Sequence, residues 1–286
     1  MVDSIWSYLR QTNSIGLEDL PLFLKICALA GIFRFFLTYL VIGQLAKHIN
    51  FKNEKIRFKF THRGYDCIHY WFSTITGFLA ILQRPYYHCF YWTFNCGEEF
   101  LQQVEPTDRI IMSGFEKFYY MIFTAYYMVD FFFIWTNSAD KKLLVVHHFT
   151  TISLILISIY IRTGVIGVNV MLLHDIVDAP LYLGKVCTYL EWKTMQDVSL
   201  LVFAATCTWF RMICLPGVIV NGVLNISKRK PDHYGFYLTE GAILLVLMYC
   251  HIYWFKRIVM SAINIFTKGK DAICDNRSDD ATNHIE

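Results

Sequence analysis

Apolar stretches of membrane-spanning length recur along the chain, with short polar loops between them. A helix needs about 20 largely apolar residues to cross the hydrocarbon core of a bilayer. The pattern therefore predicts an all-α fold, a polytopic membrane protein with about seven transmembrane helices. The expected spans are Pro21–Leu45, His69–Tyr91, Phe115–Trp135, Leu143–Ile161, Gly164–Lys185, Val198–Val220 and Phe236–Ile263. The second span is the least regular, because its uninterrupted apolar stretch is short.

The amino-acid composition also points to a membrane. Hydrophobic residues make up 55% of the 286 positions and charged residues 17%, whereas soluble domains usually carry about a quarter charged residues. A net charge of +3 gives no reason to expect a nucleic-acid partner. The nine cysteines include no CxxC pair, which argues against a structural zinc site. Cys89 and Cys96 share one loop, and whether they pair stays open.

Lysine and arginine are concentrated in the loops after the first, third and fifth spans and beyond the seventh. The clearest examples are the stretch from Lys47 to Arg63 and the pair Lys141-Lys142. Because short cytosolic loops carry an excess of these residues, the distribution predicts a lumenal N-terminus and a cytosolic C-terminus. Lys228-Arg229-Lys230 is the main signal in the opposite direction.

Ionisable residues within the spans are the strongest functional signal. His147 and His148 lie roughly 6–8 Å inside the cytosolic end of their span, at 1.5 Å per residue. Asp175 and Asp178 of the next span, and Asp130 of the third, fall at a similar depth. Such groups are costly in a bilayer and usually face a protein interior with a function. Their common level predicts an active site in the cytosolic half of the membrane.

Spacing along the helices supports this interpretation. Asp178 stands four residues after His174 and three after Asp175, so it can share a face with either. Thr151 stands four residues after His147 and is placed to orient an imidazole. A histidine can act as a base, an acid or an acyl-accepting nucleophile, with a carboxylate fixing its tautomer. The set fits acyl transfer to an amine or a hydroxyl, although Asp130 alone fits a structural role equally well.

Two rival chemistries fit the sequence less well. Membrane di-iron oxygenases need repeated HxxH boxes, which are absent, so we predict no metal. A proton-coupled transporter needs broken helices at the midplane, and only Pro180 and Pro216 are candidates for such breaks. Glu240 and His251 of the last span are further candidates to line a cavity, with Glu240 near the lumenal end.

The polar cluster also resembles a known motif. The run from Tyr126 to Lys185, with His147-His148-x-x-Thr151 and Leu173-His174-Asp175-x-x-Asp178, resembles the longevity-assurance motif of ceramide synthases. These enzymes are a branch of the TLC-domain family of helical lipid proteins. Trp209-Phe210-Arg211 followed by Pro216 is similar to the Thr-Arg…Pro pattern of the next-to-last span. The implied organisation is an N-terminal segment over 1–54, a TLC domain over 55–265 and a polar cytosolic tail over 266–286.

The resemblance implies N-acylation of a sphingoid long-chain base by fatty acyl-CoA, giving ceramide or dihydroceramide in the endoplasmic reticulum membrane. Fatty acyl-CoA would be a co-substrate, with no bound cofactor, and membrane lipids would surround the protein. The sequence leaves open whether the chain forms homo- or hetero-oligomers. The implied catalytic residues are His147, His148, Asp175 and Asp178. The residues expected to contact substrate are His174, Thr151, Arg211 and Asp130.

Some positions depart from the ceramide synthase pattern. Phe60–Tyr70 lacks the Trp-Arg pair that usually enters the domain, and the homeobox-like insert of many animal members is missing. Tyr126–Asp130 looks more like the broader TLC pattern. A non-catalytic TLC protein that binds lipid, senses lipid or escorts cargo is therefore the alternative. The His-Asp-x-x-Asp cluster favours the enzyme, because a pocket for apolar chains has no need of paired carboxylates.

Overall fold

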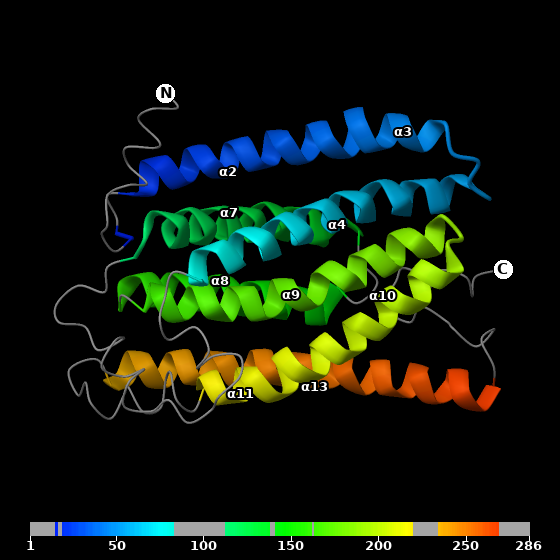
Figure 1. Cartoon of the computed structure of the whole chain (residues 1–286). Coiled ribbons are helices and arrows are strands. Elements are labelled where there is room, and N and C mark those ends of the chain that lie inside the picture. The colour runs from blue at the N-terminus through cyan, green and yellow to red at the C-terminus, as the bar shows by residue number, and fades with distance from the viewer. Residues whose placement is uncertain are drawn as a thin grey trace.

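Long helices lie side by side and alternate in direction along the chain (Figure 1). The computed structural model describes residues 15–16, 19–82, 112–137, 141–161, 163–219 and 234–268, and this part of the chain contains no strand. The helices are α2 (Leu20–Phe35), η2 (Phe36–Ile42), α3 (Gly43–Lys47), α4 (Glu54–Ile81), α7 (Gly114–Asn137), α8 (Lys141–Tyr160), α9 (Gly164–Tyr189), α10 (Lys193–Thr206), η3 (Cys207–Cys214), α11 (Leu215–Val218) and α13 (Tyr234–Lys268). The π-helical segments η2 and η3 continue α2 and α10 without a break.

Five of these helical segments are long and apolar enough to cross a membrane, which makes the chain a multi-pass membrane protein. They are Leu20–Lys47, Lys142–Tyr160, Gly164–Tyr189, Lys193–Gly217 and Tyr234–Met260. The expected all-α fold is confirmed, whereas the expected number of spans is not. The helix α4 is long, but the charged residues of its N-terminal half lower its apolar content.

The helix α4 corrects the second expected span, His69–Tyr91. The helix begins at Glu54, where the side chain of Asn53 accepts a hydrogen bond from the backbone N–H of Ile56 at 2.9 Å. It ends at Ile81, and residues 83–91 lie outside the described part of the chain. The basic stretch expected to be a loop is therefore largely helical. A capping residue started the helix well before the apolar run on which the prediction depended.

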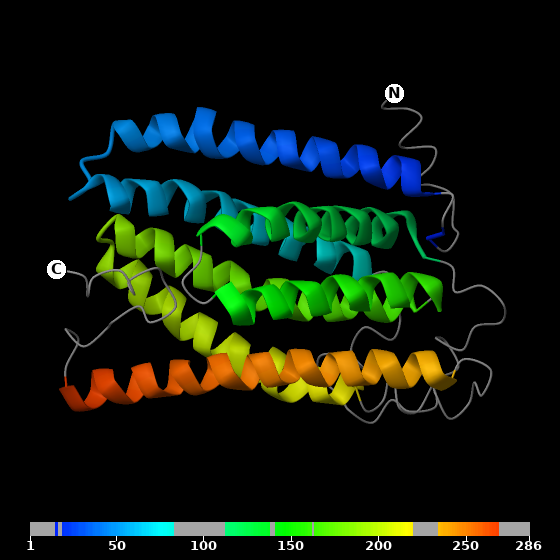
Figure 2. The same cartoon turned by 180° about the vertical axis from the view of Figure 1, so that it is seen from behind.

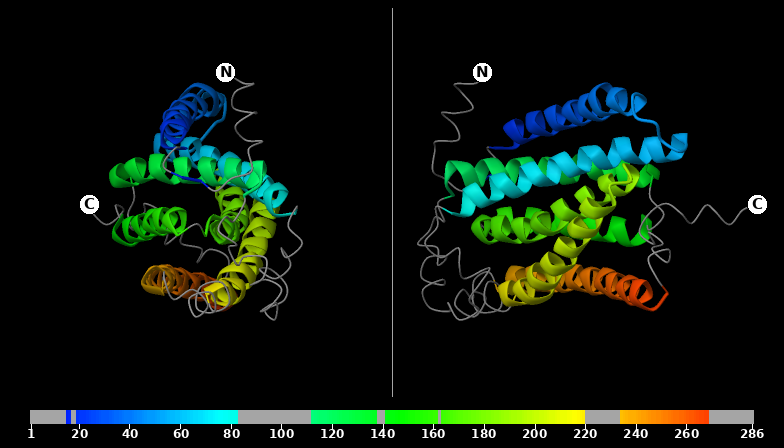
Figure 3. Two further views of the ribbon diagram at one scale, coloured as in Figure 1. Left: turned by 90° about the vertical axis from the view of Figure 1, so that its left-hand side faces the viewer. Right: turned by 45° about the vertical axis from the view of Figure 1, so that its right-hand side comes forward.

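The helix α9 forms the centre of the bundle. Of its most apolar window 89% is buried, compared with 17–39% for the other four candidate spans. It packs against α4 on one side and α10 on another, while α2 and α13 lie at opposite edges of the bundle (Figures 2 and 3). Pro180 does not interrupt it, since the helix runs from Gly164 to Tyr189. Polar residues of α9 therefore face protein rather than lipid.

Candidate active site

Three buried histidines meet in the middle of the bundle, one from each of α8, α9 and α13. The ring centroid of His174 lies 6.0 Å from that of His147 and 4.8 Å from that of His251. The centroids of His147 and His251 are 5.6 Å apart, and the indole of Trp254 packs edge-on against His147. We call these three imidazoles the histidine cluster. Each histidine is at most 6% exposed.

Hydrogen bonding defines the proton positions of His174. Its Nδ1 lies 2.7 Å from the backbone carbonyl of Val170, one helical turn earlier. A carbonyl only accepts, so Nδ1 carries the proton and Nε2 carries the lone pair. This buried Nε2 has no hydrogen-bond partner within the described residues. His174 therefore presents a bare proton acceptor in the interior of the bundle.

Arg211 binds the backbone of His174. It lies in the π-helical segment η3 and is 4% exposed. Its Nη2 donates to the backbone carbonyl of His174 at 2.9 Å and to Oδ2 of Asp178 at 2.8 Å. Asp178 is half-buried, with 16% of its side chain exposed. The guanidinium group thus connects the backbone of His174 to the carboxylate of Asp178.

Asp175 has different neighbours. Its Oδ2 accepts hydrogen bonds from Ser73 Oγ of α4 at 2.5 Å and from Tyr119 OH of α7 at 2.6 Å. Its Oδ1 has no hydrogen-bond partner within the described residues. These contacts connect Asp175 to α4 and α7, whereas Asp178 is bound by Arg211 of η3. That either carboxylate orients a catalytic imidazole stays a prediction.

The histidine pair of α8 also divides between two environments. His148 Nε2 lies 3.1 Å from Oδ2 of Asp130, and its Nδ1 lies 3.1 Å from the backbone carbonyl of Leu144. Asp130 in turn accepts from Nη1 of Arg34 at 2.5 Å. The carboxylate that orients a member of the pair is therefore Asp130. His147 instead faces His174 and His251.

Thr151 has a structural contact where an imidazole contact was expected. Its hydroxyl donates to the backbone carbonyl of His147 at 2.9 Å. A threonine in a helix commonly bonds back to the preceding turn. The side chain still reaches the neighbouring pocket.

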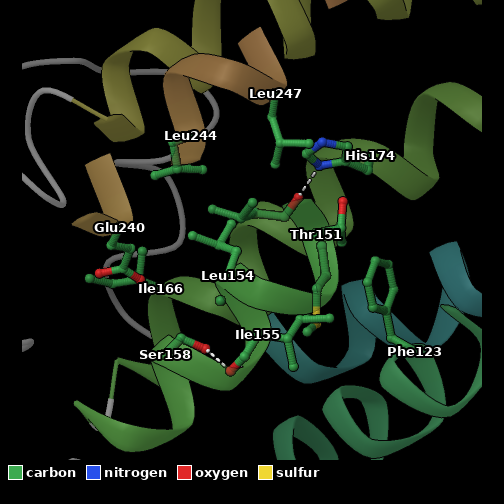
Figure 4. Close-up of a pocket in the computed structure, with 13 residues that line it drawn as sticks. Phe123, Thr151, Leu154, Ile155, Ser158, Ile166, His174, Glu240, Leu244 and Leu247 are labelled. Atoms are coloured by element: carbon green, nitrogen blue, oxygen red, sulfur yellow. Dashed lines mark hydrogen bonds between the residues drawn. The ribbon is translucent and has the colours of Figure 1, made fainter. Parts of the chain in front are cut away.

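An apolar pocket runs from the histidine cluster along α8, α9 and α13 (Figure 4). Thr151 and His174 lie at one end of it, and Ser158 and Glu240 lie at the other. Its walls between these ends are formed by apolar side chains, among them Leu154, Val170, Met171, Leu244 and Leu247. The apolar lining is suited to contact with a hydrocarbon chain whose reacting end meets the imidazoles.

Some residues of the site were outside the sequence-based set. The sequence indicates His251 only as a candidate to line a cavity, although its position within an apolar span is a strong signal. Arg34 has the same signal in the first span and is not in the sequence-based set. Ser73 and Tyr119 give no sequence signal, because serine and tyrosine are common in membrane helices. Within the described residues, no group of three His, Cys, Asp or Glu side chains is placed to hold a metal ion.

Comparison with known proteins adds a family context to this geometry. A family model described as "TLC domain" matches residues 59–260. Alternaria stem canker resistance protein 1 of Solanum lycopersicum is 30% identical over 174 residues, which are 57% of this chain and 54% of that protein. Ceramide synthase LOH1 of Arabidopsis thaliana is 26% identical over 242 residues, covering 80% of this chain and 76% of the relative. Human ceramide synthase 1 is 29% identical over 137 residues, 45% of this chain and 39% of the human protein.

Proposed function

Because this chain belongs to the TLC-domain family, we propose that it transfers a fatty acyl group from acyl-CoA to the amine of a sphingoid long-chain base. The product would be ceramide or dihydroceramide. Similarity to proteins named ceramide synthase, from plants and animals, supports this reaction class. Acyl-CoA is the co-substrate, and the chemistry is carried by side chains without a bound cofactor.

One structural observation carries the proposal. His174 is both a member of the histidine cluster and a wall residue of the apolar pocket. An acyl chain lying in this pocket would therefore have its carbonyl at the imidazoles. A site that only stores or senses lipid gains nothing from a bare imidazole nitrogen at this point, because a buried polar atom without a partner costs free energy.

The reaction requires two protons to be removed from the nitrogen of the attacking ammonium group. The amine binds as an ammonium ion, and it must lose one proton before its nitrogen attacks the thioester carbonyl and a second as the amide forms. The C–N bond forms, the C–S bond breaks, coenzyme A leaves as the thiol after taking up one of these protons, and the other proton is released to water. An imidazole is suited to such transfers because its ordinary pKa lies near neutrality.

The geometry suggests separate roles within the predicted catalytic set. We assign proton transfer, or transient acyl attachment, to His147 together with His174. The half-buried carboxylate of Asp178 is placed to attract the ammonium group, and Arg211 fixes its position. His148 and Asp130 would act as positioning residues. Both ring nitrogens of His148 already have hydrogen-bond partners, the Leu144 carbonyl and Oδ2 of Asp130. Asp175 would fix α9 against α4 and α7.

The membrane arrangement belongs to the same proposal. The helices α4 and α7 run alongside the five apolar helices and have their ends at the same two ends of the bundle (Figure 1). We therefore assign them as additional spans, giving seven in total. The positive loops favour an endoplasmic reticulum protein with a lumenal N-terminus and a cytosolic C-terminus. This orientation places the histidine cluster within reach of cytosolic acyl-CoA.

The test is N-acyl transfer by the purified full-length protein. Wild type, His147→Ala and His174→Ala would receive a sphingoid base and a panel of acyl-CoA lengths. Glu191→Gln serves as the control, because Glu191 is exposed and pairs with Lys52 at the end of the bundle. We expect product from wild type and the control, and at least a hundredfold loss in the histidine variants. Absence of product over the whole panel, from a folded wild-type protein, would refute the enzyme and leave a lipid-binding TLC protein.

A further inference from the structure

The end of the pocket remote from the histidine cluster is polar, although its walls are apolar. Glu240 of α13 lines this end and is 3% exposed. Its Oε1 accepts a hydrogen bond from Thr163 Oγ1 at 3.1 Å. Its Oε2 is buried and has no hydrogen-bond partner within the described residues. A carboxyl oxygen in this state is stabilised only by a partner that enters the pocket.

The neighbouring hydroxyl groups cannot provide that partner. Ser158 Oγ and Tyr120 OH each lie 3.0 Å from the backbone carbonyl oxygen of Ile155, and one of the two hydroxyl groups donates to the other. The two hydroxyl oxygens are 2.5 Å apart. Since each hydroxyl has only one proton, both donors are used within the protein. What remains at this end is a set of acceptors: Glu240 Oε2 and the lone pairs of the hydroxyl oxygens.

The chemistry of a ligand group that would bind at this end follows from this set of acceptors. A methyl group would leave Oε2 unsatisfied, and a carboxylate would place two acids side by side. A hydroxyl group can donate to Oε2 and can also accept a proton if Glu240 is protonated. It also fits at the end of an apolar chain.

The two ends of the pocket differ, and this difference defines where on the ligand the hydroxyl group must be. From Glu240 to His251, α13 advances about 16 Å at 1.5 Å per residue. Glu240 and Ser158 are thus at the far end of the pocket, and His174 and Thr151 are at the reacting end (Figure 4). A molecule that fills the pocket would be an amphiphile with polar groups at both ends.

We propose that Glu240, with Ser158 and Thr163, forms a subsite for a hydroxyl group at or near the far end of the acyl chain. The preferred acyl donors would then be ω-hydroxy or near-terminal hydroxy acyl-CoAs of a length that spans the pocket. This inference rests on the proposed N-acyl transfer and names the substrate class of that same site. Glu240 is here a specificity residue, because it does not contact the reacting carbonyl.

The experiment compares matched pairs of acyl-CoAs, each pair equal in length and differing only in a terminal hydroxyl group. The measured quantity is the ratio of kcat/KM for the hydroxylated and plain chains, for wild type, Glu240→Gln and Glu240→Leu. At the best length we expect wild type to favour the hydroxylated chain about tenfold, the gain typical of a hydrogen bond to a charged group. Glu240→Gln should keep a preference, and Glu240→Leu should favour the plain chain. The two chains partition differently into detergent, and this difference is the same for every variant. Comparing the kcat/KM ratio of one variant with that of another therefore removes its effect.

Equal use of both chains at every length, or a preference for the plain chain, by wild type would overturn the subsite even if Glu240→Leu does not fold. If wild type forms no product with any chain, the proposed function fails instead. The subsite is then tested by thermal stabilisation of the purified protein with free ω-hydroxy and plain fatty acids. Greater stabilisation by the hydroxy acid in wild type and Glu191→Gln, but not in Glu240→Leu, would support it, and equal stabilisation would refute it.

Discussion

Arg211 donates a hydrogen bond from Nη2 to the backbone carbonyl of His174, at 2.9 Å and across 37 positions of the chain. The same nitrogen donates to Asp178 at 2.8 Å. One guanidinium thus determines where the histidine backbone and the neighbouring carboxylate lie relative to each other. The π-helical segment η3 places Arg211 at this point, and π-helical turns are frequent at functional sites.

Replacing Arg211 should affect folding and activity separately. Arg211→Gln leaves Asp178 partly buried without its cation, which should destabilise the protein by about 3 kcal/mol, the low end for a broken buried pair. The double variant Arg211→Met with Asp178→Leu removes both charges and should recover most of the stability. It should not recover N-acyl transfer. Thermal unfolding in detergent and the transfer assay measure the two effects, and recovery of activity in the double variant would show that the ion pair serves only the fold.

The two adjacent histidines should respond differently to the same substitution. His147→Gln removes a member of the histidine cluster and should lower kcat at least about a hundredfold with little change in melting temperature. His148→Gln removes the partner of Asp130 and should lower the melting temperature. Its loss of activity should be smaller, because His148 is bound to Asp130 and the Leu144 carbonyl and is not part of the histidine cluster. The ratio of the two kcat values, measured at saturating acyl-CoA, tests the division of roles, and an equal loss of kcat in both variants would contradict it.

Asp175 offers a contrast between two substitutions. Asp175→Asn can keep its carbonyl oxygen towards Ser73 and Tyr119 and turn its amide group to the side where Oδ1 has no described partner. We expect this variant to fold normally and to retain activity. Asp175→Ala leaves two buried donors unsatisfied and should cost about 2 kcal/mol. If the Asp175→Asn protein folds but has no activity, that result would support the catalytic role of Asp175 that the sequence motif implies.

The sequence predicts those parts of this structure that depend on local properties. Helix length and apolar content give the helical membrane fold, because a bilayer requires long apolar segments. The rarity of ionisable residues in such segments identifies His147, His174 and Asp178. The rings of His147 and His174 lie 6.0 Å apart, and Arg211 connects Asp178 to the backbone of His174. These inferences need no knowledge of which helices are neighbours.

The partners of these residues depend on helix rotation and packing, which the sequence does not reveal. Asp175 was expected beside a histidine and instead accepts from α4 and α7, whereas Asp130, a weaker candidate, contacts His148. Spacing within one helix limits which side chains share a face, but the facing helix decides which of them meet. The start of α4 does have a local sequence signal, because Asn53 is a good N-cap residue. The pattern of apolar residues alone does not contain this signal.

Gly77 lies at a close contact of α4 with α9 and α7, and this contact supports the position of Asp175. A Cβ atom at this residue would lie 2.7 Å from Leu172 Cδ1 and 3.0 Å from Tyr119 Cζ. Gly77→Ala should therefore destabilise the protein by about 1–3 kcal/mol, as expected for overpacking, and should displace the tyrosine that donates to Asp175. The measurement is the melting temperature in detergent together with N-acyl transfer.

Gly31→Ala is the matched control, because a Cβ atom there meets nothing within 4 Å. This substitution should be neutral or slightly stabilising, since alanine favours a helix more than glycine does. Adding Leu172→Val to Gly77→Ala removes the bulk that the new methyl group meets and should recover part of the lost stability. If Gly77→Ala is as stable as Gly31→Ala, then α4 can move away from α9 at little cost. In that event, the hydrogen bonds of Ser73 and Tyr119 to Asp175 would not depend on this close contact.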